Sequence, residues 1–282
     1  MSDNPATFPA ANNLPASSLL ICSRNRPQLL LESVESVLSG DAVPTELLIM
    51  DQSDRPHPIL QNYHTERPCE VRYVPVRVVG ECPSKNIGMR LARYDILVFT
   101  DDDILATPGW FGALVRALEA AGPRGVVTGQ VFPTEPASPG GFAPTKKVDP
   151  RPAIYQGRVG EDVLFPMNMA MYRSAIETVG DFDERFGAGG PFHGAEDNDL
   201  GYRLLEAGYR IHYVPEAGLY HRAWRGAQDY VRTRWIYGYC QGAFYAKYLS
   251  LRDPYMLRRM AWDLFRHAKR LPRRIVRLEQ QW

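Results

Sequence analysis

From residue 18 to about residue 131 the chain alternates short aliphatic runs with longer amphipathic ones, and this alternation constrains the fold more than any other feature. Such a pattern is typical of βαβ units stacked around a mostly parallel sheet. The expected strands are the short aliphatic runs at 19–22, 47–50, 71–74, 96–100 and 125–131. Helices are expected between them, after Pro27, over 83–93 and over 108–121. The fold class is therefore α/β.

The second half of the chain is less regular. Residues 132–160 are rich in proline and glycine, which predicts a long irregular loop; loops of this length are more often functional lids than spacers. The further expected elements are strands at 167–172, 210–214 and 218–221, helices at 174–179 and 195–207, and helical structure from 229 onward. We divide the chain into a disordered lead (1–17), an α/β domain (18–228) and a basic amphipathic helical C-terminal extension (229–282).

Composition excludes several classes of protein. The 282 residues carry 33 Lys and Arg against 32 Asp and Glu, and this balance argues against binding of nucleic acid by bulk electrostatics. The four cysteines form no CxxC pair, so neither a disulfide framework nor a thiolate zinc site is predicted. We find neither a signal-peptide pattern nor an apolar stretch of ~20 residues, and expect a cytoplasmic protein.

The most informative local feature is an acidic triplet at the end of a strand. The aliphatic run 96–100 leads directly into Asp101, Asp102 and Asp103, where open α/β sheets bind ligands. Residues i and i+2 of an extended segment project to the same side, so Asp101 and Asp103 can face one ligand while Asp102 points away. Adjacent carboxylates favour a hard divalent cation, so the triplet predicts a Mg²⁺ or Mn²⁺ site that also takes phosphate. The alternative is an acidic turn that caps the next helix.

Two later features have competing interpretations. A glycine-rich turn at 187–194 precedes Glu196, Asp197 and Asp199, which either complement a helix dipole or supply a general base near a close-approaching substrate. His221 follows a short expected strand and is either structural or a ligand.

Taken together, these blocks resemble the family 2 glycosyltransferases, and the resemblance extends over roughly 18–225. The segments that carry it are Ser23-Arg24-Asn25-Arg26, Asp51-Gln52-Ser53, Pro83-Ser84-Lys85-Asn86-Ile87-Gly88, Thr100 to Asp103, Val179-Gly180-Asp181-Phe182-Asp183-Glu184, Glu196-Asp197-Asn198-Asp199-Leu200 and Tyr220-His221-Arg222. The resemblance implies the GT-A fold, with a DxD metal motif in the acidic triplet. It also implies inverting transfer of a sugar from a nucleotide-diphosphate donor, most often UDP-linked, to an acceptor hydroxyl.

The resemblance also implies roles for individual residues. The nucleotide-sugar set comprises Ser23, Arg24, Asp51, Lys85, Asp101 and Asp102. Within it, Asp51 would bind the base and Asp101 would approach the ribose. Asp103 and His221, together with Asp101, would hold Mn²⁺ or Mg²⁺. Asp197 would be the catalytic base, and Glu196 is its nearest competitor.

The pattern departs from the family at two positions: Gln52 stands where Asp or Asn is frequent, and Lys85 where Arg is common. Lysine supplies charge without the planar fork of arginine, so the nucleotide is less well specified than the fold. Two alternatives remain at this stage. A nucleotidyltransferase would also use carboxylates and metal, but residues 18–28 lack the glycine-rich phosphate loop typical of that class. A non-catalytic nucleotide-sugar-binding module would bind donor without turnover.

Positive charge is concentrated at the end of the chain. Residues 251–278 hold nine Arg and Lys against two Asp, a local charge of +7, which leaves −6 for the rest. Aromatic and aliphatic residues lie between these charges. Such a helix either lies on an anionic membrane surface, here the inner face of the cell membrane, or packs on the domain with a solvated basic face. The acceptor is expected to be a glycan, a lipid-linked molecule or a small molecule.

Overall fold

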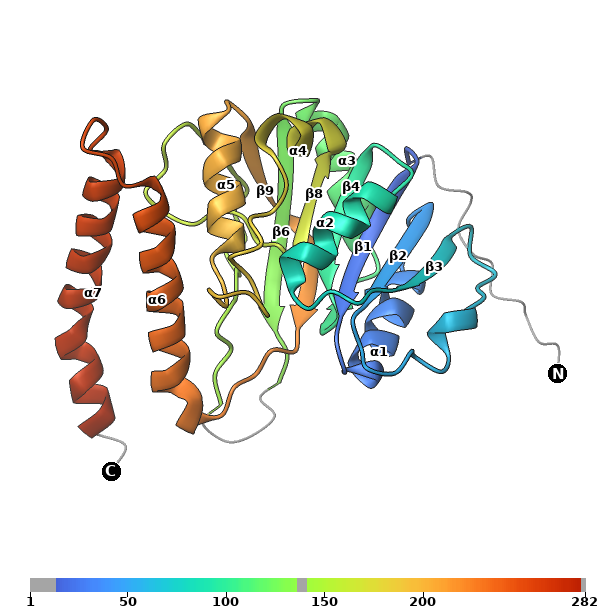
Figure 1. The fold of residues 1–282 in the computed structure, drawn as a ribbon, viewed down its shortest axis with the longest axis horizontal. Coiled ribbons are helices and arrows are strands. Elements are labelled where there is room, and N and C mark those ends of the chain that lie inside the picture. Colours follow the sequence, from blue (N-terminus) through green and yellow to red (C-terminus); the bar gives the residue numbers. More distant parts are fainter. Residues whose placement is uncertain (1–13, 136–140, 280–282) are drawn as a thin grey trace.

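The structure is a computed structural model that describes residues 14–135 and 141–279. Its centre is a mixed sheet of strand order β3-β2-β1-β4-β8-β6-β9-β5, and β7 pairs with β9 beside this path (Figure 1). The strands are β1 (Ser17–Ser23), β2 (Glu46–Asp51), β3 (Glu70–Pro75), β4 (Ile96–Asp101), β5 (Ile104–Ala106), β6 (Gly125–Pro133), β7 (Ala153–Gln156), β8 (Asn168–Tyr172) and β9 (Arg210–His221). The helices are α1 (Pro27–Leu38), α2 (Glu81–Leu91), α3 (Trp110–Ala121), α4 (Arg173–Val179), α5 (Glu196–Glu206), α6 (Tyr230–Tyr248) and α7 (Tyr255–Glu279), with short 3₁₀ turns at η1 (Leu60–Asn62) and η2 (Ala227–Asp229).

Helices cover both faces of the sheet because its central strands are apolar on both sides. In β1, Leu19 and Ile21 join one core cluster, with α1 and α3, whereas Leu20 joins the other, with α2, α4 and α5. All three side chains are at most 1% exposed. Strands buried on both faces read as continuous aliphatic runs, which explains why the sequence pattern located them. The predicted α/β class is confirmed.

The sheet is less parallel than the sequence predicts. Strands β3, β2, β1 and β4 are parallel, but β8 lies between β4 and β6 and runs antiparallel to both. The strand over 125–131 therefore does not extend the parallel sheet next to β4. Pairing partners are chosen by packing between distant segments, so periodicity along the chain identifies a strand without identifying its neighbour.

Several predicted boundaries are wrong. The two strands expected at 210–214 and 218–221 form one strand, β9, whose pairing with β6 shifts between Gly129 and Val131. The irregularity accommodates Pro215, which has no N–H for a ladder hydrogen bond. The irregular loop at 132–160 contains β7, and its closure as a lid stays a prediction. Of the disordered lead, residues 1–13 lie outside the described residues, but Ser17 begins β1 and Leu14 packs against the core.

The C-terminal helices α6 and α7 stand beside α5 as an antiparallel pair at one end of the molecule (Figure 1). A third apolar cluster joins them to the rest of the chain, with Phe186 and Phe244 at 2% and 0% exposure and Tyr245 and Met256 also buried. An ion pair of Arg259 with Asp162 ties α7 to the segment that precedes β8. The first part of the basic extension therefore packs on the α/β domain.

Candidate active site at the carboxyl edge of the sheet

Three parallel strands end side by side at one edge of the sheet. In the register of the ladder, Ser23 lies opposite Asp51, and Cys22 lies opposite Asp101. The carboxyl ends of parallel strands are where open α/β sheets bind their ligands. Pairing of β1 with β2 and β4 thus brings two of the predicted acidic residues to a common ligand-binding edge.

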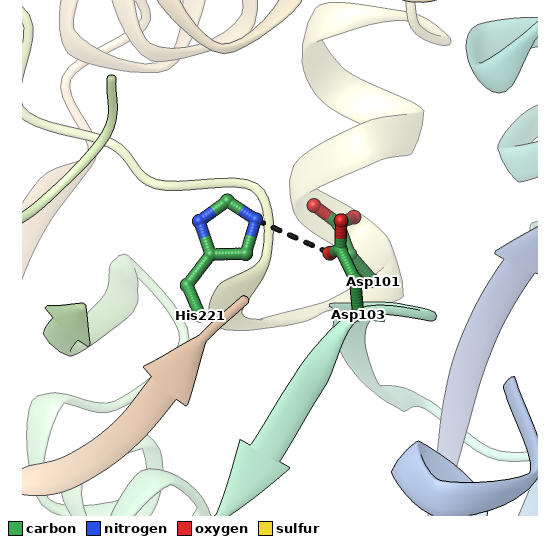
Figure 2. A group of neighbouring side chains, drawn as sticks. All are labelled: Asp101, Asp103 and His221. Carbon is green, nitrogen blue, oxygen red and sulfur yellow. Dashed lines mark ion pairs between the residues drawn. The ribbon is translucent and has the colours of Figure 1, made fainter. Parts of the chain in front are cut away.

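His221 reaches the same edge through the end of β9. Strand β5 pairs antiparallel with β9 so that Ile104 lies opposite His221, and the Arg222 N–H donates to the carbonyl oxygen of Asp103 at 2.8 Å. As a result, ligand atoms of Asp101, Asp103 and His221 lie within 4.8 Å of one another. His221 Nε2 is 3.2 Å from Asp103 Oδ1. A dashed line marks this pair in Figure 2.

The electrostatics of this group reflect crowded negative charge. Burial raises the pKa of Asp101 to about 6, despite the nearby ammonium of Lys85. Burial also acts to raise the pKa of Asp103, but its contacts with His221 and Arg26 outweigh this and the net shift is downward. The pKa of His221 is raised, because contact with Asp103 outweighs the opposing effect of burial.

The donor set fits a divalent cation of the Mg²⁺ or Mn²⁺ kind. Two carboxylates and one imidazole supply three ligands, and such ions often keep the remaining positions for water and phosphate oxygens. Asp102 does not join this group. It is fully buried and accepts hydrogen bonds from Ser23 Oγ at 2.6 Å and from Arg26 Nε at 3.0 Å.

No role was predicted for Arg26, although it lies in the 23–26 segment that resembles the family. Its guanidinium pairs with Asp102 and, at 3.0 Å, with Asp103, and 45% of its side chain is exposed. A partly exposed arginine beside a carboxylate of the candidate metal site is suited to binding a diphosphate. The partners of Arg26 are distant in sequence, so the pairing could not be predicted. The one sequence signal was the position of Arg26 just after a strand end.

A cavity of about 1140 Å³ opens over this edge. One wall comes from the sheet and includes Ser23, Arg24, Asp101, Asp103 and His221. The rest of the cavity lining comes from the start of α5, from α6 and from α7, and includes Glu196, Asp197, Tyr237, Gln241 and Asp263. The helical extension therefore completes the cavity, which the sequence did not predict because no local pattern relates α6 to the strand ends.

The start of α5 places two carboxyl groups in the cavity wall. Burial, reinforced by Asp162, raises the pKa of Asp197 to about 7. The pKa of Glu196 is raised well above its ordinary value by burial, with Glu81 and Asp197 adding to the effect. Glu196 Oε2 has no hydrogen-bond partner among the residues that the structure describes. The backbone before them turns at Ala195, which has a φ of 69°.

The third acidic residue of α5 has a structural role. Asp199 is fully buried and binds Lys247, Tyr248 and Arg203, the last two at 2.6 and 2.9 Å. Lys247 also pairs with Asp183 at 2.8 Å. These contacts hold the end of α6 against the domain, so Asp199 anchors a helix that lines the cavity.

The glycine-rich turn before α5 packs against the start of α2. Gly189 has a φ of 86°, and a Cβ at this position would lie 2.8 Å from the Cα of Gly80. Only glycine permits so close an approach of two backbones. The turn thus brings the α5 carboxyl groups next to the helix that carries Lys85.

The remaining predicted nucleotide residues lie around the same edge. Asp51 is 3% exposed; its Oδ1 accepts from Ser53 N–H at 2.9 Å, and its other oxygen accepts from Tyr73. Lys85 is 1% exposed and lies 2.5 Å from a carboxylate oxygen of Glu81 and 3.9 Å from one of Asp101. Arg24 is exposed at the cavity wall. Their roles toward a nucleotide stay predictions.

Sequence comparison assigns the chain to a class of enzymes, the glycosyltransferases. Residues 18–179 match the sequence profile of glycosyl transferase family 2, so the chain belongs to this family of enzymes, as the resemblance predicted. The pre-mycofactocin glycosyltransferase of Mycobacterium tuberculosis (strain ATCC 25618 / H37Rv) is 26% identical over 168 residues, which cover 56% of this chain and 33% of the relative. Validoxylamine A glucosyltransferase of Streptomyces hygroscopicus subsp. limoneus is 25% identical over 227 residues, covering 69% and 49%. The chain thus spans a third to a half of the length of these curated relatives.

Solved structures give the same fold. GalNAc-T7, crystallised with UDP, GalNAc and Mn²⁺, matches 77% of this chain and 45% of its own with a TM-score of 0.58 at 18% identity. S. aureus TarS 1–349, crystallised with UDP-GlcNAc, matches 75% and 60% with a TM-score of 0.57 at 14% identity. The predicted GT-A fold is confirmed. In the described ranges 14–135 and 141–279, no helix combines the length and apolar character needed to cross a bilayer.

Proposed function

We propose that this protein is a metal-dependent, inverting glycosyltransferase that moves a sugar from a nucleotide-diphosphate donor, with UDP preferred, to an acceptor hydroxyl. One observation carries the proposal. A group of two carboxylates and a histidine that could hold a cation lines the same cavity, of about 1140 Å³, as the carboxyl pair of α5. A shared cavity supports a mechanism in which the leaving group binds at the first group and the second supplies the base.

Asp197 is the better base of the two neighbouring acids. With a pKa of about 7 it is about half ionised at neutral pH, where a general base is most effective. The pKa of Glu196 is also raised, by burial first and then by Glu81 and Asp197, which favours its protonated form. Glu196 then contributes polarity and shape to the wall without accepting the proton of the acceptor.

The sheet side of the cavity binds the diphosphate. Arg26 offers guanidinium donors beside Asp103, and Lys85 adds a buried positive charge beside Asp101. A divalent cation held by Asp101, Asp103 and His221 would act as a Lewis acid toward the leaving diphosphate, a contribution of several kcal/mol. Asp102 keeps Arg26 in place through its buried carboxylate.

The reaction is a single displacement at the anomeric carbon. The acceptor oxygen forms a bond to this carbon as the bond to the diphosphate oxygen breaks, and the electron pair of that bond leaves with the nucleoside diphosphate. Asp197 takes the proton of the acceptor hydroxyl. Attack from the side opposite the leaving group inverts the configuration of the carbon. The sheet-edge group and the α5 carboxyl groups, which line one cavity, would serve the two sides of this displacement.

The comparisons support the donor class more than the acceptor. GalNAc-T7 and TarS were crystallised with UDP compounds, which favours a UDP-sugar here. The two curated relatives are named for different small molecules, pre-mycofactocin and validoxylamine A. We therefore propose a hydroxyl acceptor on a glycan, a lipid-linked molecule or a small molecule, and Mn²⁺ or Mg²⁺ as the metal.

The test is a thermal-shift titration with UDP and UDP-sugars, with and without Mn²⁺. Preferential binding to the folded state raises its stability, by about 2.7 kcal/mol when the ligand is at 100 times its Kd. We expect a shift with UDP that grows with Mn²⁺ in the wild type and in Asp41→Ala, a matched control at an exposed aspartate. The metal-dependent part should vanish in Asp103→Ala. Absence of any nucleotide response would overturn the proposal.

A further inference from the structure

Helix α7 exposes large apolar side chains on its outer face. Four large side chains on its outer face are strongly exposed, at 48%, 55%, 64% and 56%: Leu257, Trp262, Leu264 and Phe265. Its inward side carries Met256, which is 2% exposed in the third apolar cluster, together with Arg259, which is 6% exposed against Asp162. A helix that packs only against its own domain would carry polar side chains on its outer face, so the exposed apolar side chains of α7 indicate another contact.

The neighbouring helix adds to the exposed apolar surface. On α6, Val231, Trp235 and Tyr239 are 77%, 67% and 51% exposed. The rings of Trp235 and Tyr239 stack with centroids 5.4 Å apart, and those of Trp262 and Phe265 stack at 5.7 Å. Aromatic side chains exposed in this way are typical of surfaces that meet the boundary between water and lipid.

Positive charge surrounds this surface. Arg252, Arg258 and Lys269 are exposed, and within residues 14–135 and 141–279 none of them forms an ion pair. Four more arginines, whose side chains lie outside the described residues, bring the local charge to +7: Arg270, Arg273, Arg274 and Arg277. A second copy of the chain would bring two such regions together and repel. The partner must therefore have an anionic surface. It must also offer an apolar layer, because Leu257 and Leu264 are exposed and apolar.

We propose that α6 and α7 dock this protein on an anionic lipid bilayer, with the outer side chains of α7 in the interface and the arginine and lysine residues on the headgroups. Burial of apolar side chains and attraction to anionic lipid add together in such contacts. Helices that lie in the interface need not cross the bilayer.

Docking would bring the cavity to the bilayer surface. Leu264 belongs to the exposed outer face and also lines the cavity, together with Met260 and Arg266 of the same helix. The apolar surface therefore continues to the edge of the cavity. Within the proposed function, on which this step rests, the favoured acceptor is a hydroxyl carried by an amphiphile that stays in the membrane.

Vesicle co-sedimentation of the full chain tests the docking itself. The vesicles contain phosphatidylcholine alone or phosphatidylcholine with phosphatidylglycerol, at low and at high salt. We expect binding to the anionic vesicles at low salt, and much weaker binding to neutral vesicles or at high salt. The double variant Trp262→Ser/Phe265→Ser should bind roughly tenfold or more weakly. Arg258→Glu/Lys269→Glu should lose roughly fivefold per removed cation.

Ile59→Ser is the matched control, because Ile59 is 52% exposed and lies in a different part of the fold, next to η1. It should bind vesicles like the wild type. Circular dichroism and the UDP thermal shift in vesicle-free solution show that each variant is folded and has an intact nucleotide site. They also separate failure of docking from failure of the proposed function.

Three results would overturn the docking proposal. One is absence of binding to anionic vesicles at low salt by a folded wild-type protein. Another is unchanged binding of Trp262→Ser/Phe265→Ser. The third is a stable dimer of the wild-type protein in light scattering that is absent in this double variant. That result would assign the outer face to a second copy of the chain.

Discussion

Two acidic clusters face the same cavity, and they differ in what surrounds their charges. At the sheet edge, Asp102 and Asp103 pair with Arg26, and Asp101 lies 3.9 Å from Lys85. At the start of α5, Asp199 takes the contacts with Lys247 and Arg203. No ion pair forms at Glu196 or Asp197 within residues 14–135 and 141–279.

The difference separates two kinds of chemistry. At the sheet edge, contacts with His221 and Arg26 outweigh burial and hold the pKa of Asp103 down. Burial still raises the pKa of Asp101 to about 6 and that of Asp102 to about 7. A bound divalent cation would favour the ionised forms of Asp101 and Asp103. Buried carboxyl groups without a cation favour the protonated form, which brings Asp197 to a pKa of about 7, suited to a base. Two acidic segments of the sequence thus suit different roles: residues 101–103 suit a binding site, and the start of α5 suits a proton acceptor.

The largest effect is expected at the sheet-edge cluster. Asp103→Ala removes a ligand and leaves His221 without its 3.2 Å partner. Loss of a Lewis acid worth several kcal/mol predicts a fall in transfer rate of roughly 10⁴-fold. Steady-state transfer assays at saturating Mn²⁺ measure it, with Asp41→Ala as control. A variant that keeps more than a tenth of the wild-type rate would remove Asp103 from the metal site.

At the α5 cluster, Asp197→Asn should lower kcat by roughly 10²- to 10⁴-fold, since it removes the general base. Donor binding in the thermal-shift assay should be unchanged.

Glu196→Gln should lower kcat by less than roughly tenfold, because a protonated glutamic acid and a glutamine are close in shape and charge. The reverse order of the two losses would make Glu196 the base. If the wild-type protein binds donor but transfers sugar to no acceptor, the chain would be a non-catalytic nucleotide-sugar-binding module.

The anchoring role of Asp199 predicts an effect on stability. Lys247→Ala leaves the buried Asp199 carboxylate without its ammonium partner, although Tyr248 and Arg203 remain. We expect the free energy of unfolding to fall by about 2 kcal/mol, roughly 30-fold in the equilibrium constant. Urea denaturation measures the change. Lys146→Ala, at an exposed lysine, should be neutral, and equal midpoints for the two variants would contradict the anchor.

The smallest effect is the slope of the pH profile. Asp197 accepts a proton only when ionised, so kcat/KM should fall about tenfold per unit as pH drops below about 7. The residual activity of Asp197→Asn should lack this limb; a wild-type limb in that variant would assign the titration elsewhere. The free energy of unfolding should depend on pH in the opposite direction to the activity. A folded-state pKa above the unfolded value of 3.8 means that stability is lost as pH rises from about 4 to about 7, and the substitution should flatten that loss.

The sequence predicted the positions of the strands far better than it predicted which strands pair with each other. The strands β1, β2 and β4 lie where aliphatic runs predicted them, because a strand buried on both faces needs such residues and little else. Strand β7 escaped prediction because it is short and pairs at the edge through β9. The insertion of β8 beside β4 also escaped, since it depends on packing between segments that no local pattern connects.

For the site, the sequence by itself determined the acidic triplet at a strand end, the acidic start of α5 and the concentration of charge in the last 30 or so residues. These depend on residue type and local spacing. The family resemblance implied that His221 and Asp103 lie together, and the structure supplies the geometry of that pair. Tertiary structure alone decided that Arg26 pairs with Asp102 and Asp103 and that α6 and α7 line the cavity. Each of these joins segments distant along the chain, and such contacts are set by sheet register and core packing.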